Sequence, residues 1–85
     1  MQSYLVVFES QSNAAHLIGM IKAFTGWGKI TDTAWIVTTY SNATEVRDAL
    51  LKVAAPTDRI FVVKSGALAA WSNVHADNDW IKRNI

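Results

Sequence analysis

Three short runs of strand-forming residues carry apolar side chains on both of their faces. They lie at residues 4–8, 35–37 and 60–63. Successive side chains of a strand point to opposite faces of a sheet, so a sheet with one open face alternates apolar and polar residues. These runs do not alternate. The sequence therefore predicts a sheet whose two faces are both covered.

Start and stop signals predict the order of the elements. Residues 3–9, 26–30, 34–39 and 59–64 have strand composition, and apolar residues recur at helical spacing in 14–24 and 43–53. Ser10, Ser12 and Asn13 offer caps for the first helix, and Asn42 with Glu45 forms a capping box for the second. The order β-α-β-β-α-β predicts an α+β, ferredoxin-like two-layer sandwich.

The whole chain, residues 1–85, is predicted to be one domain. Residues 1–66 hold the six core elements, and residues 67–85 form a C-terminal segment with a short helix within 73–84. Trp71 and Trp80 give this segment large apolar side chains. Burial of such side chains strongly favours packing, so we expect the segment to dock on the domain.

Composition excludes several classes of function. The chain has no cysteine, which excludes disulfides, thiol catalysis and cysteine-bound metals. Its formal charge of +1 gives no broad positive field of the kind that nucleic-acid binders carry, so charge neither requires nor excludes a nucleic-acid partner. The first apolar run lacks a basic leader and ends at Glu9, so we expect a cytoplasmic protein without a membrane partner.

The second sheet face has two candidate covers, which do not exclude each other: the C-terminal segment and a second copy of the chain. We expect a homodimer whose sheets face one another, with the C-terminal segments closing the edges. The predicted interface consists of Tyr4, Val6, Phe8, Trp35, Val37, Phe61, Val63, Trp71 and Trp80.

Glu9 is the candidate metal-binding and catalytic residue. It ends the first strand, where a two-fold axis would bring two carboxylates together to bind a largely hydrated Mg²⁺. The simpler explanation, which we favour, is that Glu9 only flanks the start of a helix, where negative charge is stabilising. No cofactor is expected outside this metal-binding alternative.

Other polar residues are better explained by structure. Ser12 and His16 lie one helical turn apart and could suggest a catalytic triad, but a helix cap explains Ser12 and a solvated side chain explains His16. His75, Asp77 and Asp79 could suggest a metal site, but the two aspartates are better explained as charges around the start of the C-terminal helix. A patch that binds phosphates and bases would need the cations Lys29, Arg59, Lys64, Lys82 and Arg83 together with an aromatic residue such as Tyr40. These cations are scattered along the sequence, and each is better explained as a solubilising charge at the end of an element. No general acid–base pair can be assigned.

Three segments resemble a known family. The segments are Ser-Tyr-Leu-Val-Val-Phe-Glu ending at Glu9, Thr-Ala-Trp-Ile-Val after the hairpin turn, and Arg-Ile-Phe-Val-Val-Lys before Gly66. They are similar to the small ferredoxin-like proteins of CRISPR adaptation (Cas two) and their virulence-associated protein D relatives. The resemblance implies homodimers, and in some members metal-dependent nucleases or nucleic-acid scaffolds with an aspartate at the position of Glu9.

The chain departs from that family at its site. Glu9 is one methylene longer than aspartate, and Val37 and Thr38 replace an acidic residue often found in the third strand. A displacement of about 1 Å can cost a catalyst on the order of 10²-fold, which weakens the nuclease interpretation. We therefore favour a homodimeric binding protein with a protein or nucleic-acid partner over a Mg²⁺-dependent endonuclease that uses Glu9 from each copy.

Overall fold

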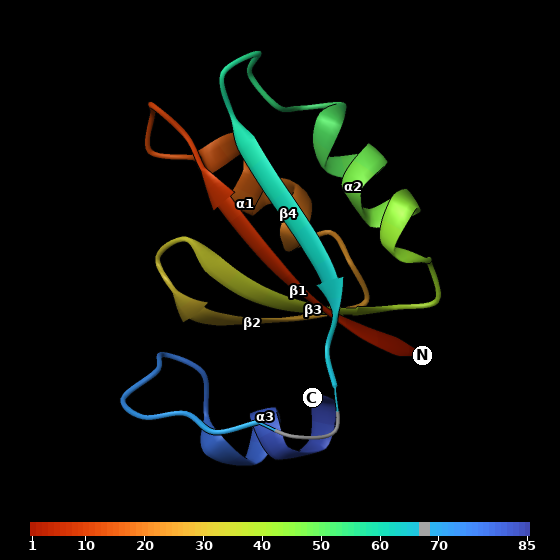
Figure 1. The fold of residues 1–85 in the computed structure, drawn as a ribbon, viewed down its shortest axis with the longest axis vertical. Helices are drawn as coiled ribbons and strands as arrows, with labels where there is room; N and C mark the ends of the chain where they lie inside the picture. The colour runs from red at the N-terminus through yellow and green to blue at the C-terminus, as the bar shows by residue number, and fades with distance from the viewer. Residues whose placement is uncertain (67–68) are drawn as a thin grey trace.

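The computed structural model describes residues 1–66 and 69–85, so positions 67 and 68 of the predicted C-terminal segment lie outside the described residues. The elements follow the chain in the order β1 (Gln2–Glu9), α1 (Ala15–Ile21), β2 (Gly26–Thr31), β3 (Ala34–Thr39), α2 (Ala43–Leu51), β4 (Arg59–Lys64) and α3 (Asn78–Asn84) (Figure 1). The α+β class is confirmed, and the predicted bounds of β3 and β4 agree with the structure.

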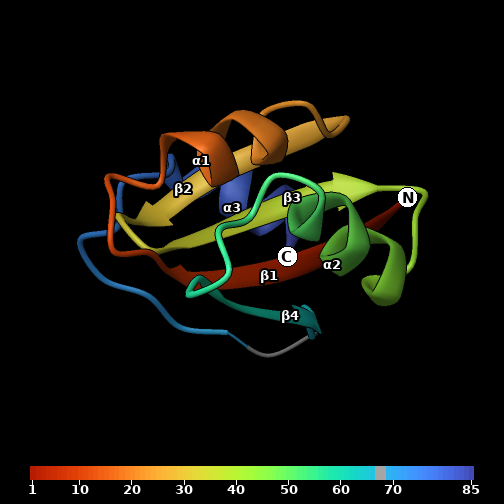
Figure 2. The same ribbon diagram turned by 90° about the horizontal axis from the view of Figure 1, so that it is seen from above.

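The sheet has four strands in the order β2-β3-β1-β4, and every neighbouring pair is antiparallel. Strands β3 and β1 are central, whereas β2 and β4 are the edges. Helices α1 and α2 lie on one side of the sheet, and α3 lies on the other side, below the sheet in Figure 1 (Figures 1 and 2). The sheet is thus covered on parts of both faces.

The main core lies between the sheet and helices α1 and α2. Leu17 and Ile21 of α1 and Val46 and Leu50 of α2 are buried against alternate side chains of the central strands. These strand residues are Tyr4, Val6, Phe8, Trp35 and Val37. The intervening side chains, such as Ile36, therefore point to the face of α3.

The two main helices begin in different ways. In α2, the Asn42 side chain accepts from the Glu45 amide at 2.8 Å, and the Glu45 side chain accepts from the Asn42 amide at 2.9 Å, which confirms the capping box. The predicted side-chain cap of α1 is wrong, because its N-cap is Ala14 in a left-handed conformation (φ 61°). Asn13 instead accepts from the amide of Ala15.

The C-terminal segment packs on the second face of its own sheet. Ile81 of α3 is buried, and the Trp80 ring lies over Gly28 of β2. The backbone amide of His75 also donates to the Ile30 carbonyl at 3.2 Å. This helix starts later than the earliest predicted position, because Asp77 supplies the cap by accepting from the Trp80 amide.

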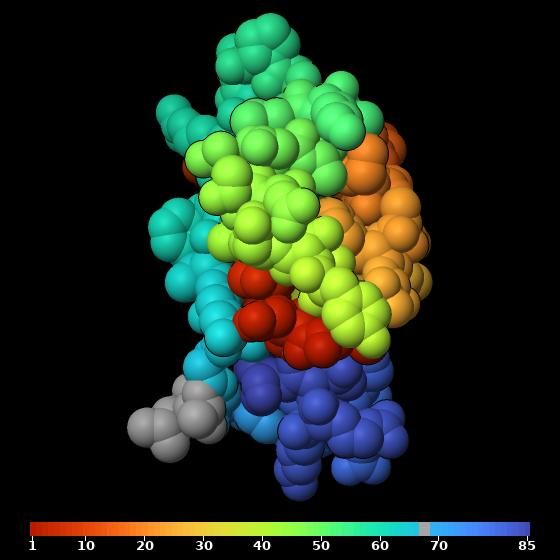
Figure 3. All heavy atoms as spheres, turned by 90° about the vertical axis from the view of Figure 1, so that its right-hand side faces the viewer, coloured from red at the N-terminus to blue at the C-terminus, as the bar shows by residue number. Residues whose placement is uncertain are grey.

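The described C-terminal residues, seen in blue at the base of the space-filling view, form a layer against the β-sheet domain (Figure 3). Among the described residues, no helix is both long and apolar enough to cross a membrane.

Candidate functional site

The nine predicted interface residues do not lie on one surface. Tyr4, Val6, Phe8, Trp35 and Val37 are each at most 4% exposed, because they face α1 and α2 in the core. Phe61 and Val63 pair with Val7 and Leu5, so they lie on the opposite face. Trp71 and Trp80 belong to the docked C-terminal segment. Of the nine, the two β4 residues are the exposed ones on the sheet.

This geometry corrects the expected stacking of two sheets. The five core residues cannot contact a second copy while the helices cover them. On the other face, the Trp80 ring already lies over Gly28, and Ile36 and Ile81 are both buried. A second sheet would have to displace α3 before it reached this half of the face.

Strand β4 presents the uncovered part of the second face. Phe61 is 61% exposed and Val63 is 41% exposed, and their neighbours Leu5 and Val7 on β1 are only partly buried. The hollow between this face and the C-terminal segment is lined by Leu5, Ile36, Val63 and Ile85, among others. The described residues of the segment that line this hollow therefore leave Phe61 uncovered, and an apolar strip remains at the β4 edge.

The backbone at this edge is open as well. Within the described residues, β4 pairs with β1 on one side and has no strand on the other. The amide of Ser65 donates inward to Ser3. Since inward and outward residues alternate along an antiparallel ladder, the backbone groups of Ile60, Val62 and Lys64 point outward. We refer to these outward groups, with Phe61 and Val63, as the β4 edge.

The opposite edge of the sheet is protected. Strand β2 shifts register between Lys29 and Thr31, and the amide of His75 binds the Ile30 carbonyl. Bulges and covering segments are ways in which proteins block unwanted pairing of edge strands. Strand β4 carries neither device in the described structure, although its ends, Arg59 and Lys64, are charged.

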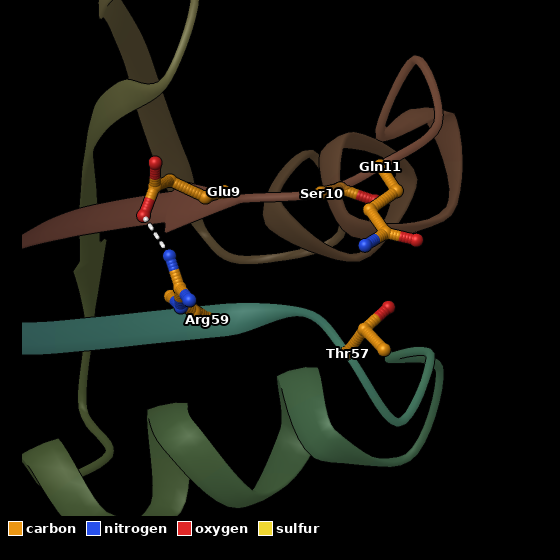
Figure 4. Close-up of a pocket in the computed structure, with 5 residues that line it drawn as sticks. All are labelled: Glu9, Ser10, Gln11, Thr57 and Arg59. Atoms are coloured by element: carbon orange, nitrogen blue, oxygen red, sulfur yellow. Dashed lines mark hydrogen bonds and ion pairs between the residues drawn. The ribbon is translucent and has the colours of Figure 1, made fainter.

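Glu9 lies in an open polar hollow at the end of β1 (Figure 4). Ser10 and Gln11 of the following loop line it from one side, and Thr57 and Arg59 line it from the other. The Arg59 Nη1 atom lies 3.3 Å from Glu9 Oε1, and both side chains are largely exposed. The Glu9 carboxylate is thus already paired with a cation.

The described residues contain no group of three His, Asp or Glu side chains close enough to hold a metal ion. A metal at Glu9 would have to compete with the Arg59 guanidinium and take its remaining ligands from water or another molecule. The role of Glu9 as a Mg²⁺ ligand therefore stays a prediction.

The sequence did not reveal the His16–Asp58 pair. His16 Nε2 lies 2.7 Å from Asp58 Oδ2, and the Asp58 side chain is only 1% exposed. The same oxygen accepts from the Ala55 amide at 2.8 Å. The expectation of a solvated His16 is wrong in this respect, and no local pattern signals a contact between residues 42 positions apart.

The other polar candidates have structural partners. Ser12 accepts from the Ala14 amide and lies 3.1 Å from the Ser10 hydroxyl, so it has partners in the loop before α1 but does not cap the helix. Lys29 pairs with Asp32 at 3.1 Å, and His75 lies 4.0 Å from the same carboxylate. Asp77 caps α3, and Asp79 occupies its first turn. These contacts do not assemble a nucleophile with a base.

Comparisons of the chain with models of known families, with curated proteins and with solved structures found no match. The resemblance to the Cas two and virulence-associated protein D families therefore stays a prediction.

Proposed function

We propose that this chain is a small homodimeric binding protein built on the ferredoxin-like plan. The element order and the strand order β2-β3-β1-β4 support that plan. The observation that carries the function is the exposure of Phe61 and Val63 on β4, an edge strand that pairs with β1 on one side and, among the described residues, with no strand on the other. An apolar strip beside unpaired backbone groups favours association with another chain.

The energetics favour covering this strip. Full burial of a Phe or Val side chain stabilises a protein by about 1.5–3 kcal/mol, and Phe61 and Val63 retain much of their surface in solvent. In a two-fold dimer each residue would contribute twice. Contact with a second copy would bury part of this surface, and this gain is opposed by the translational and rotational freedom lost on association.

Sedimentation velocity and light scattering of the unaltered chain, from low to high micromolar concentration, test the proposal. We expect the mass to rise toward twice that of the 9.4 kDa chain. Replacing Phe61 and Val63 together by serine should keep the fold and return the mass to that of one chain. A single-chain mass at every concentration would contradict the homodimer.

The Mg²⁺-dependent endonuclease that uses Glu9 from each copy remains the alternative. The ion pair of Glu9 with Arg59 supports a structural role for the carboxylate instead. A dimer that contacts its partner through β4 does not require Glu9, so the two functions predict opposite effects of replacing it.

A further inference from the structure

We infer that β4 pairs antiparallel with β4 of a second copy, about a two-fold axis that passes through Val62. The inference rests on the proposed homodimer and specifies its contact. It would join the two sheets edge to edge into one continuous sheet with four strands from each copy. Helix α3 could then stay on its own sheet, which face-to-face stacking does not allow.

The outward backbone groups fit this register. Ile60, Val62 and Lys64 point away from β1 at every second position, with Val62 in the middle. A two-fold axis at Val62 pairs Val62 with its own copy and Ile60 with Lys64 of the second copy. Each of these would be a hydrogen-bonded pair, so all three outward residues of both strands would find backbone partners.

The side chains are complementary in the same register. Phe61 would lie opposite Val63 of the second copy in a non-hydrogen-bonded pair, where side chains approach most closely. Pairs of an aromatic and a β-branched residue stabilise a sheet when they lie directly opposite each other. The axis generates this pair twice and merges the two exposed strips into one on the second face.

The charges select an antiparallel second copy over a parallel one. Arg59 and Lys64 lie at opposite ends of β4. In antiparallel pairing, Lys64 faces Ile60 and Arg59 faces Ser65, so no two cations are opposed. A parallel arrangement in register would place Lys64 beside Lys64 and Arg59 beside Arg59, and like charges directly opposite destabilise a sheet.

The two sheet edges differ in the way that this inference requires. The β2 edge carries a register shift and a hydrogen bond from the His75 amide, whereas the β4 edge carries three outward residues and two exposed apolar side chains. Because edges that do not pair are normally blocked, the open edge is the expected site of contact.

Two variants of the full chain test the contact. Phe61→Lys places a charge in the merged strip, and Val62→Pro removes the outward amide at the axis, while the inward bonds to β1 stay intact. We expect each to raise the dimer dissociation constant by about tenfold or more. Thr31→Lys, at an exposed position on β2, is the matched charge control and should leave it unchanged. Circular dichroism verifies that each variant folds.

Disulfide trapping tests the register. The chain has no cysteine, so each single variant carries one thiol. Val62→Cys places the two thiols on directly opposed residues with Cα atoms about 5.5 Å apart, within disulfide range. Phe61→Cys places them on diagonal positions about 7–8 Å apart, outside it. Under mild oxidation, at concentrations at which sedimentation shows that both variants are dimeric, Val62→Cys should form covalent dimers much faster than Phe61→Cys.

The outcomes separate the inference from the proposed function. The β4 contact is overturned, but the homodimer is kept, if the dimer survives both Phe61→Lys and Val62→Pro. Equal rates of disulfide trapping at the two cysteine positions have the same meaning. A single-chain mass for the unaltered protein overturns both. Loss of the dimer in the two edge variants, together with fast trapping at Val62→Cys, supports the contact and its axis.

Discussion

His16 Nε2 donates to Asp58 Oδ2 across 2.7 Å and so ties α1 to the turn that leads into β4. Asp58 also accepts from the Ala55 amide within that turn. The hydrogen bond from His16 lowers the pKa of Asp58, and the nearby Ser10 hydroxyl and Ala55 amide lower it further, while burial opposes them. The pair thus links helix α1 to the turn between α2 and β4, on the side of the sheet that carries the main core.

The lowered pKa of Asp58 makes the stability of the domain pH-dependent. A group whose pKa is lower in the folded state stabilises it above the unfolded value, about 3.9 for aspartate, and loses that contribution as the pH falls through the folded value. We expect the free energy of unfolding to decrease below about pH 4 through this group. Urea denaturation at a series of acidic pH values measures it.

Asp58→Asn supplies the comparison, because it keeps the size of the side chain but removes the titration. The variant should be less stable than the unaltered protein near pH 6, and the difference should shrink toward pH 2. Asp48→Asn, on the exposed surface of α2, is the control for a general loss of negative charge. A difference between Asp58→Asn and the unaltered protein that stays constant with pH would refute the prediction.

Gly28→Ala should weaken the docking of the C-terminal segment. A Cβ atom at Gly28 would lie 2.5 Å from the Trp80 ring, so the ring or the backbone would have to move. Overpacking of this kind typically costs 1–3 kcal/mol of unfolding free energy. Urea denaturation followed by tryptophan fluorescence measures the loss.

The control for this change is Gly66→Ala, since no atom of the described residues, its chain neighbours aside, lies within 4 Å of its added Cβ. The loss caused by Gly28→Ala should also be smaller in a Trp80→Leu background, where the ring is gone. If the alanine costs the same with and without Trp80, the contact between Gly28 and Trp80 does not limit this position.

The sequence predicts where the strands lie better than which way they face. Composition and turn residues placed β3 and β4 correctly, and Asn42 with Glu45 located the start of α2. A strand that is apolar on both faces carries no sign of which face meets the helices. The prediction therefore grouped Phe61 and Val63 with Tyr4 and Val6, whereas the β1–β4 register places them on opposite faces.

Long-range contacts explain the remaining differences. Nothing local to His16 or Asp58 specifies that they meet, because the contact depends on how α1 and the α2–β4 turn pack. Similarly, the Trp80 contact with Gly28 follows only once α3 lies on the sheet. Among the described residues, the open β4 edge follows from the strand order and from the part of the sheet that the C-terminal segment covers.

Asn42→Ala should destabilise the domain through α2. The Asn42 side chain satisfies the Glu45 amide, and its loss leaves an unpaired donor at the helix start. Replacing a cap residue by alanine typically costs about 0.5–2 kcal/mol. Urea denaturation should show this loss for Asn42→Ala and much less for Asn42→Asp, which keeps the accepting oxygen. Equal losses for both variants would count against the capping box.

Glu9→Gln separates the binding protein from the nuclease. If Glu9 only pairs with Arg59, its replacement should change the unfolding free energy by less than about 1 kcal/mol, since both side chains are largely exposed. The mass of the dimer should not change, because Glu9 lies outside the β4 edge.

Labelled single- and double-stranded RNA and DNA, incubated with Mg²⁺ or Mn²⁺ and with EDTA, provide the nuclease measurement. The binding protein predicts no metal-dependent cleavage by the unaltered chain. Cleavage that EDTA and Glu9→Gln both abolish, while Arg59→Gln retains it, would make Glu9 catalytic and favour the endonuclease. Binding that weakens with added salt, but without cleavage, would instead make a nucleic acid the partner of the dimer, because phosphate contacts are salt-sensitive.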